Sequence, residues 1–77
     1  MKVFQLHVDS EKCYWIGIAL VAAISYEAAV VEYAKNSDSG EFVASGEIIF
    51  TSDSQKPLDG LTSVKDGILC DVVTFDA

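Results

Sequence analysis

The sequence predicts an α+β fold, with a mostly antiparallel sheet of about four or five strands and a single helix packed on one face. Three observations favour this class: alternation of apolar residues near the start, one amphipathic helical stripe in the middle, and further apolar β-branched segments separated by polar turns. The expected order is strand, strand, helix, strand, an optional short strand, and strand. With 77 residues, the chain is expected to form one small domain, 1–77.

The first two strands are expected to form a β-hairpin. Apolar residues occupy alternate positions in 2–8, which is typical of a half-buried strand. The polar residues 9–12 have the length of a hairpin connection. Residues 13–21 are continuously apolar and rich in aromatic and β-branched side chains. That composition predicts a central strand covered on both faces.

A helix is expected over residues 26–36. Ser25 precedes it, and a serine hydroxyl at this position can accept a hydrogen bond from a free amide of the first turn. Asn36 is expected to end the helix in the left-handed conformation. The apolar stripe consists of residues that recur at helical spacing: Tyr26, Ala29, Val30, Tyr33 and Ala34. This stripe predicts that one side of the helix packs against the sheet.

The segment after the helix is expected to begin with a third strand, residues 41–51, with Gly46 as a bulge or a point of close approach. Polar residues and Pro57 predict a loop over 51–60. Residues 61–64 are ambiguous between a short strand and a turn of helix.

The C-terminal part is expected to hold the last strand. Asp66-Gly67 has the composition of a type I′ turn, and residues 68–75 are apolar and β-branched. Asp71 places a charge inside this apolar segment. Such a residue faces solvent or protects a sheet edge from pairing with another chain, unless it has a functional role.

Charge and hydropathy limit the classes of partner and the compartment. Twelve acidic and five basic residues give a formal net charge of −7, which disfavours nucleic acids and anionic membranes as partners. The longest apolar run, Cys13 to Ile24, is too short to cross a bilayer, and the N-terminus does not resemble a signal peptide. A soluble, cytoplasmic protein is therefore expected. Cys13 and Cys70 are expected to be free thiols in a reducing compartment, with a disulfide between them as the alternative.

The candidate chemical groups predict no enzyme, no metal and no cofactor. His7 and Asp9 share a strand face, but the sequence lacks the nucleophile elbow that would complete a catalytic triad. The acids at 53, 59, 66 and 71 do not have the spacing of a calcium loop. The glycines form no phosphate-binding motif. Catalytic, cofactor-binding and metal-ligating residues are therefore predicted to be absent.

The predicted sheet has more apolar surface than one helix can cover. In residues 13–21, Tyr14, Ile16, Ile18 and Leu20 alternate with a second apolar set that includes Trp15. If the helix covers one face, the opposite face is left for an interaction with another protein surface. The residues assigned to that interaction surface are Trp15, Val43, Ile49, Val73 and Phe75. Because twofold dimers are the commonest closed assemblies, a homodimer formed through a sheet face or edge is predicted.

The favoured function is therefore a non-enzymatic protein-interaction or accessory module that acts through an apolar sheet face. One alternative is a small-molecule-binding domain with a pocket between helix and sheet, lined by the tyrosines. Another is a small acidic inhibitor that occupies a basic surface on a host protein.

Folding is expected not to depend on a metal ion, because the sequence lacks a recognisable set of metal ligands. Thermal unfolding followed by circular dichroism should have the same midpoint with and without EDTA. A clear decrease of the midpoint in the presence of the chelator would contradict this expectation.

Overall fold

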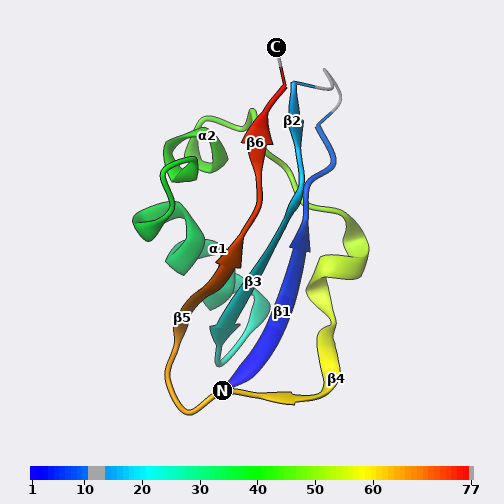
Figure 1. Cartoon of the computed structure of the whole chain (residues 1–77), viewed down its shortest axis with the longest axis vertical. Helices are drawn as coiled ribbons and strands as arrows, with labels where there is room; N and C mark the ends of the chain where they lie inside the picture. The colour runs from blue at the N-terminus through cyan, green and yellow to red at the C-terminus, as the bar shows by residue number, and fades with distance from the viewer. Residues whose placement is uncertain (11–13, 77) are drawn as a thin grey trace.

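The structure is a computed structural model that describes residues 1–10 and 14–76 (Figure 1). Its elements are β1 (Lys2–His7), β2 (Trp15–Ile16), β3 (Ile18–Ala23), α1 (Tyr26–Asn36), α2 (Gly40–Ala44), the 3-10 helix η1 (Ser52–Gln55), β4 (Pro57–Thr62), β5 (Gly67–Asp71) and β6 (Thr74–Phe75). Four strands form an antiparallel sheet in the order β4-β1-β3-β5, and β2 pairs with β6 in a second small sheet. The predicted α+β class is confirmed.

The antiparallel pairing of the first two predicted strands is also confirmed, while residues 11–13, which include part of the predicted connection 9–12, lie outside the described residues. Strands β1 and β3 pair without interruption, from Lys2 opposite Ala23 to His7 opposite Ile18. The second strand does not follow its predicted bounds of 13–21, however. It divides at Gly17 into β2 and β3, and β3 continues to Ala23.

The chain crosses itself closely at Gly17. Its φ angle is +132°, and a Cβ atom at this position would lie 2.7 Å from Val73 Cα and overlap the Val72 carbonyl group. Backbone hydrogen bonds tie the segment at Gly17 to its two neighbours. Val8 N donates to Gly17 O at 3.0 Å, and Val72 N donates to Ile18 O at 3.0 Å. The predicted final strand, 68–75, divides at the same place into β5 and β6.

Helix α1 has the predicted bounds and the predicted N-cap. The amide of Ala28 donates to the Ser25 hydroxyl at 3.1 Å. The prediction for the other end is wrong. Asn36 is the last helical residue, with its side-chain amide bonded to the Glu32 carbonyl, and Ser37 then leaves the helix in an extended conformation.

The predicted third strand over 41–51 is wrong. Its first part forms the short helix α2, and its last part makes only an isolated bridge, between Phe50 and Val8. Helix α2 packs against α1, since a Cβ at Gly40 would overlap the Ala34 carbonyl group. Gly46, with φ +84°, follows the end of α2. Ser39 before α2 and Gly46 after it are helix start and stop signals in the sequence. The alternating apolar pattern of 41–51 obscured these signals.

The region predicted as a loop over 51–60 contains regular structure instead. Thr51 precedes η1, and the buried hydroxyl of Ser54 accepts a hydrogen bond from His7 N at 2.9 Å. Strand β4 then pairs with β1 at one edge of the sheet, while β5 pairs with β3 at the other. Because β4 and β5 lie at opposite edges, Asp66-Gly67 does not form the predicted hairpin turn.

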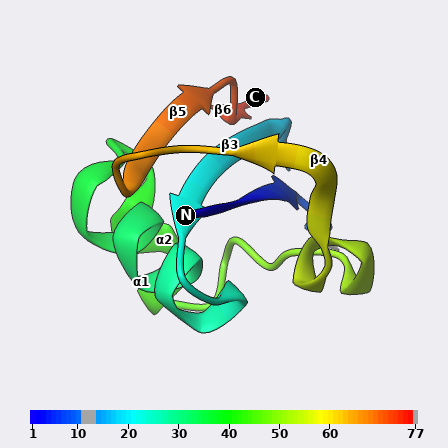
Figure 2. The ribbon, with the colours of Figure 1, turned by 90° about the horizontal axis from the view of Figure 1, so that it is seen from below.

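Both α-helices lie on the same side of the four-stranded sheet, and the core lies between them and the sheet (Figure 2). Tyr33 of α1 is completely buried there. The core consists of apolar side chains from one face of the strands, from α1, and from the C-terminal segments: Phe4, Leu6, Val8, Trp15, Ala19, Val21, Ala23, Ala29, Tyr33, Ile48 and Val73. None of the helices in the described residues is long and apolar enough to cross a membrane.

Replacement of Ser25 by alanine should lower the free energy of unfolding by about 0.5–2 kcal/mol, because the Ala28 amide loses its acceptor. Denaturant unfolding measures the change. Ser52→Ala, at an exposed serine of η1, is the control and should cost much less. Equal effects for the two variants would show that the capping bond contributes nothing.

Gly17→Ala should destabilise the protein by more than about 2 kcal/mol, because the methyl group meets the backbone of a crossing segment. Gly60→Ala is a matched control, since Gly60 also has a positive φ, +76°, but faces open space. Its cost should be limited to about 1–2 kcal/mol of backbone strain. If the two midpoints fall by the same amount in denaturant, the crossing at Gly17 is not the constraint.

Candidate functional site

The five residues predicted as an interaction surface do not form one exposed face. Trp15 and Val73 are buried in the core, Val43 is half-buried against it, and Ile49 and Phe75 are exposed. The reason is that the helices cover the face of the sheet that carries Trp15. Alternation predicts two apolar faces but not which of them a helix will cover.

The opposite face of the sheet is exposed instead. Leu20 lies between the buried residues Ala19 and Val21, and its side chain points away from the helices. We call the exposed apolar surface on this side the open face; it consists of Ile16, Ile18, Leu20, Cys70 and Val72. Ile16 and Val72 are more than half exposed, Ile18 and Leu20 are partly exposed, and Cys70 lies opposite Leu20 in the pairing of β3 and β5.

The open face ends where the chain passes from β4 to β5. This link, residues 63–66, runs past the N-terminus at the lower end of the sheet (Figure 1). The amino group of Met1 donates to Ser63 O at 2.6 Å, and Ser63 N donates to Met1 O at 2.9 Å. Val3 and Ala22 are buried at this end. The apolar opening is therefore confined to the half of the sheet nearer to β2 and β6.

The five side chains of the open face are uncharged, and polar, uncharged side chains border it on two of the described strands. On β1, Gln5 lies opposite Leu20 and His7 lies opposite Ile18. On β6, Thr74 lies opposite Ile16. The chain has a net charge of −7, and the adjacent Asp71 carboxylate accepts hydrogen bonds from Tyr33 and Ser37. Depletion of charge at an apolar patch is typical of the centre of a protein interface.

Asp71 is an exposed residue beside the open face, and its carboxylate accepts three hydrogen bonds. The hydroxyl of Tyr33 donates to Asp71 Oδ1 at 3.2 Å, Ser37 Oγ donates to Oδ2 at 2.6 Å, and Val73 N donates to Oδ1 at 3.2 Å. Burial raises the pKa of Tyr33 above its usual value, and the Asp71 carboxylate contributes to the increase. Asp71 therefore anchors the C-terminal end of α1 to β5, a structural role that its position in an apolar segment did not reveal.

The His7 and Asp9 pair is held through its backbone. Asp9 N donates to Ile49 O at 2.7 Å, and Thr51 N donates to His7 O at 2.9 Å. Among the described residues, no side-chain hydrogen bond joins the imidazole to the Asp9 carboxylate, and no group of three or more potential metal ligands is found. Cys70 is exposed, and Cys13 lies outside the described residues, so both the free-thiol expectation and the disulfide alternative stay predictions.

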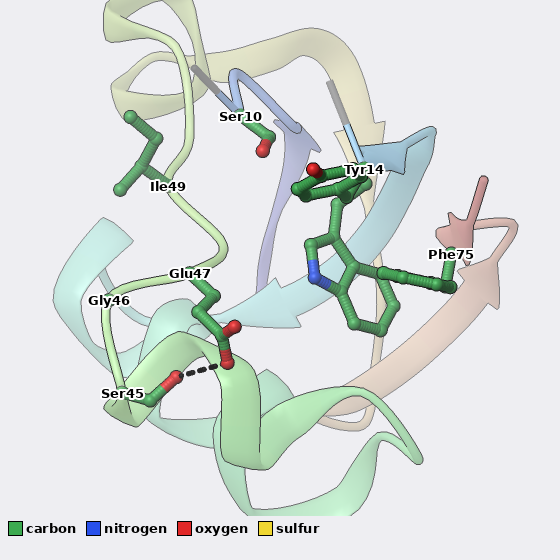
Figure 3. Close-up of a pocket in the computed structure, with 8 residues that line it drawn as sticks. Ser10, Tyr14, Ser45, Gly46, Glu47, Ile49 and Phe75 are labelled. Carbon is green, nitrogen blue, oxygen red and sulfur yellow. Dashed lines mark hydrogen bonds between the residues drawn. The ribbon is translucent and has the colours of Figure 1, made fainter. Parts of the chain in front are cut away.

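A hollow of about 440 Å³ lies at the end of the molecule that holds β2 and β6 (Figure 3). We call it the aromatic pocket; its lining residues are Ser10, Tyr14, Trp15, Ser45, Gly46, Glu47, Ile49 and Phe75. The sequence suggested, as an alternative, a pocket lined by the tyrosines; Tyr14 lines this hollow, whereas the other two tyrosines do not. Tyr33 is buried, and Tyr26 packs edge-on against Phe4 with ring centroids 6.4 Å apart. Neither tyrosine lines this pocket, nor a second hollow between α1 and the end of β3.

No protein-family model matches this chain, and comparisons with curated proteins and with solved structures yield no match. Any functional conclusion therefore depends on the surfaces described above.

Proposed function

We propose that this chain is a non-enzymatic protein-interaction module that self-associates through the open face. The observation that supports this proposal is an exposed, uncharged apolar surface on a strongly acidic chain. Ile16 and Val72 are more than half exposed there, beside Ile18 and Leu20. Burial of such side chains against a partner removes apolar area from water, which favours association.

A second copy of the chain is the partner that this surface fits best. A basic partner would be attracted by carboxylates at the contact, and the open face has none. An equally uncharged apolar surface is complementary to it, and another copy supplies that surface. In a twofold arrangement the same patch from each copy meets, and the acidic side chains stay around the contact rather than inside it. Electrostatic repulsion between two chains of charge −7 is then reduced by solvent screening.

The position of Cys70 provides an independent measure of this contact. Its thiol is exposed in a single chain and belongs to the open face. A partner on this face would shield the thiol from alkylating reagents. The rate of Cys70 modification, followed by peptide mass mapping, should therefore decrease as the protein concentration increases.

The self-association is tested by a charge introduced on the open face. We expect the unmodified protein to be dimeric at about 100 µM by sedimentation velocity, and Val72→Lys to raise the dissociation constant at least about tenfold. The ammonium group that each copy then carries into the contact causes the loss, since it is desolvated without a partner.

Val31→Lys is the matched control. Val31 lies on α1, on the helix side of the sheet, and its exposure of 50% is close to the 58% of Val72. The substitution makes the same change in charge and should leave the dimer intact. A monomeric unmodified protein at that concentration, or equal losses in the two variants, would contradict the proposal.

A further inference from the structure

We propose that the aromatic pocket is a binding site for a small organic cation, such as a quaternary or highly methylated ammonium group. This inference does not depend on self-association, because the pocket and the open face use different side chains. It depends on three aromatic rings and one carboxylate, which lie at the same end of the molecule.

The aromatic side of the pocket consists of Tyr14, Trp15 and Phe75. Phe75 is opposite Trp15 in the β2–β6 pair, with ring centroids 5.2 Å apart, and its ring lies 5.9 Å from that of Tyr14. On the core side, the ring of Phe42 packs against Trp15, with the ring centroids 4.7 Å apart. Tyr14 and Phe75 remain 51% and 57% exposed. The rings are therefore grouped by the fold but not fully covered by it.

The acidic side of the pocket is Glu47. Gly46, with φ +84°, turns the chain between Ser45 and Glu47. The Ser45 hydroxyl lies 3.1 Å from Glu47 Oε2 and donates to it. Figure 3 shows Glu47 and Ile49 on one side of the hollow and Tyr14 on the other. A ligand in the hollow would thus lie between a carboxylate and aromatic rings.

The charge of the lining selects a cation. Among the described residues that line the pocket, Glu47 is the one with a charged side chain. The chain as a whole has a net charge of −7, which repels anions and attracts cations. A neutral apolar ligand would remove water from the carboxylate without replacing its interactions. A cation compensates that loss.

The aromatic rings select an organic cation over a metal ion. Calcium prefers about six to eight oxygen ligands and magnesium about six, whereas this pocket offers one carboxylate beside apolar rings. An ammonium group that carries methyl groups binds weakly to water and interacts favourably with ring faces. The volume of about 440 Å³ is large enough for such a group together with a short substituent.

Trp15 provides a direct readout, because it is the only tryptophan in the chain and it lines the pocket. Choline is the cationic probe, and 3,3-dimethylbutan-1-ol, which has a carbon in place of the nitrogen, is its neutral isostere. We expect choline to change the Trp15 fluorescence in a saturable manner and to bind at least about fivefold more tightly than the alcohol. Equal affinities, or the absence of saturation by choline, would overturn the proposal.

Two charge-matched variants locate the bound cation. Glu47→Gln should weaken choline binding at least about threefold and leave the affinity for the alcohol unchanged, because only the carboxylate attraction is removed. Glu41→Gln removes an acid from α2 that does not line the pocket, and it should bind choline as the unmodified protein does. Equal losses in the two variants would show that choline responds only to net charge, and this would overturn the site.

Phe75→Leu tests the aromatic contribution at an exposed position, where the fold should tolerate the change. It should weaken choline binding more than binding of the alcohol, while circular dichroism confirms the folded state. An unchanged ratio of the two affinities would contradict a role for the ring. Choline titration of the Val72→Lys variant separates the two proposals, because the pocket should bind choline whether or not the chain self-associates.

Discussion

The close crossing of two backbone segments at Gly17 is the constraint on which much of this structure depends. Both long apolar segments, predicted over 13–21 and 68–75, are interrupted there, and the absence of a side chain lets the second pass directly over the first. Beyond the crossing, β2 and β6 form their own small sheet. The aromatic pocket lies at that end because the β2–β6 pair places Phe75 next to Trp15.

The position of α1 decides which sheet face remains exposed. Ser25 starts the helix directly after β3, and its other end is tied to β5 through Asp71, which receives hydrogen bonds from Tyr33 and Ser37. The helix is therefore attached at both ends to the sheet. Its apolar stripe covers the face that includes Ala19. The open face is exposed as a direct consequence, and charge is absent from it although the chain is acidic.

Local signals were sufficient for the elements whose stability depends on neighbouring residues. The helix over 26–36 was predicted with its bounds and its cap, because its apolar period and its N-cap serine agree. The first hairpin followed from alternation in 2–8. The segment 41–51 was mispredicted because its apolar residues fit a strand as well as a short helix. Its first part is helical and lies against α1, to which Gly40 packs closely.

The sequence by itself determined the α+β class, the capped helix, the antiparallel first hairpin and the excess of apolar strand surface, since each follows from composition and from short-range period. It did not determine which face of the sheet the helix covers. Both faces of the predicted strand 13–21 carry apolar side chains, and their alternation does not distinguish one face from the other. Only the tertiary structure placed Trp15 inside and Ile16 outside, through the position of the helix. The aromatic pocket was also decided at that level, because Tyr14, Glu47 and Phe75 are distant in the chain and only the fold brings them together.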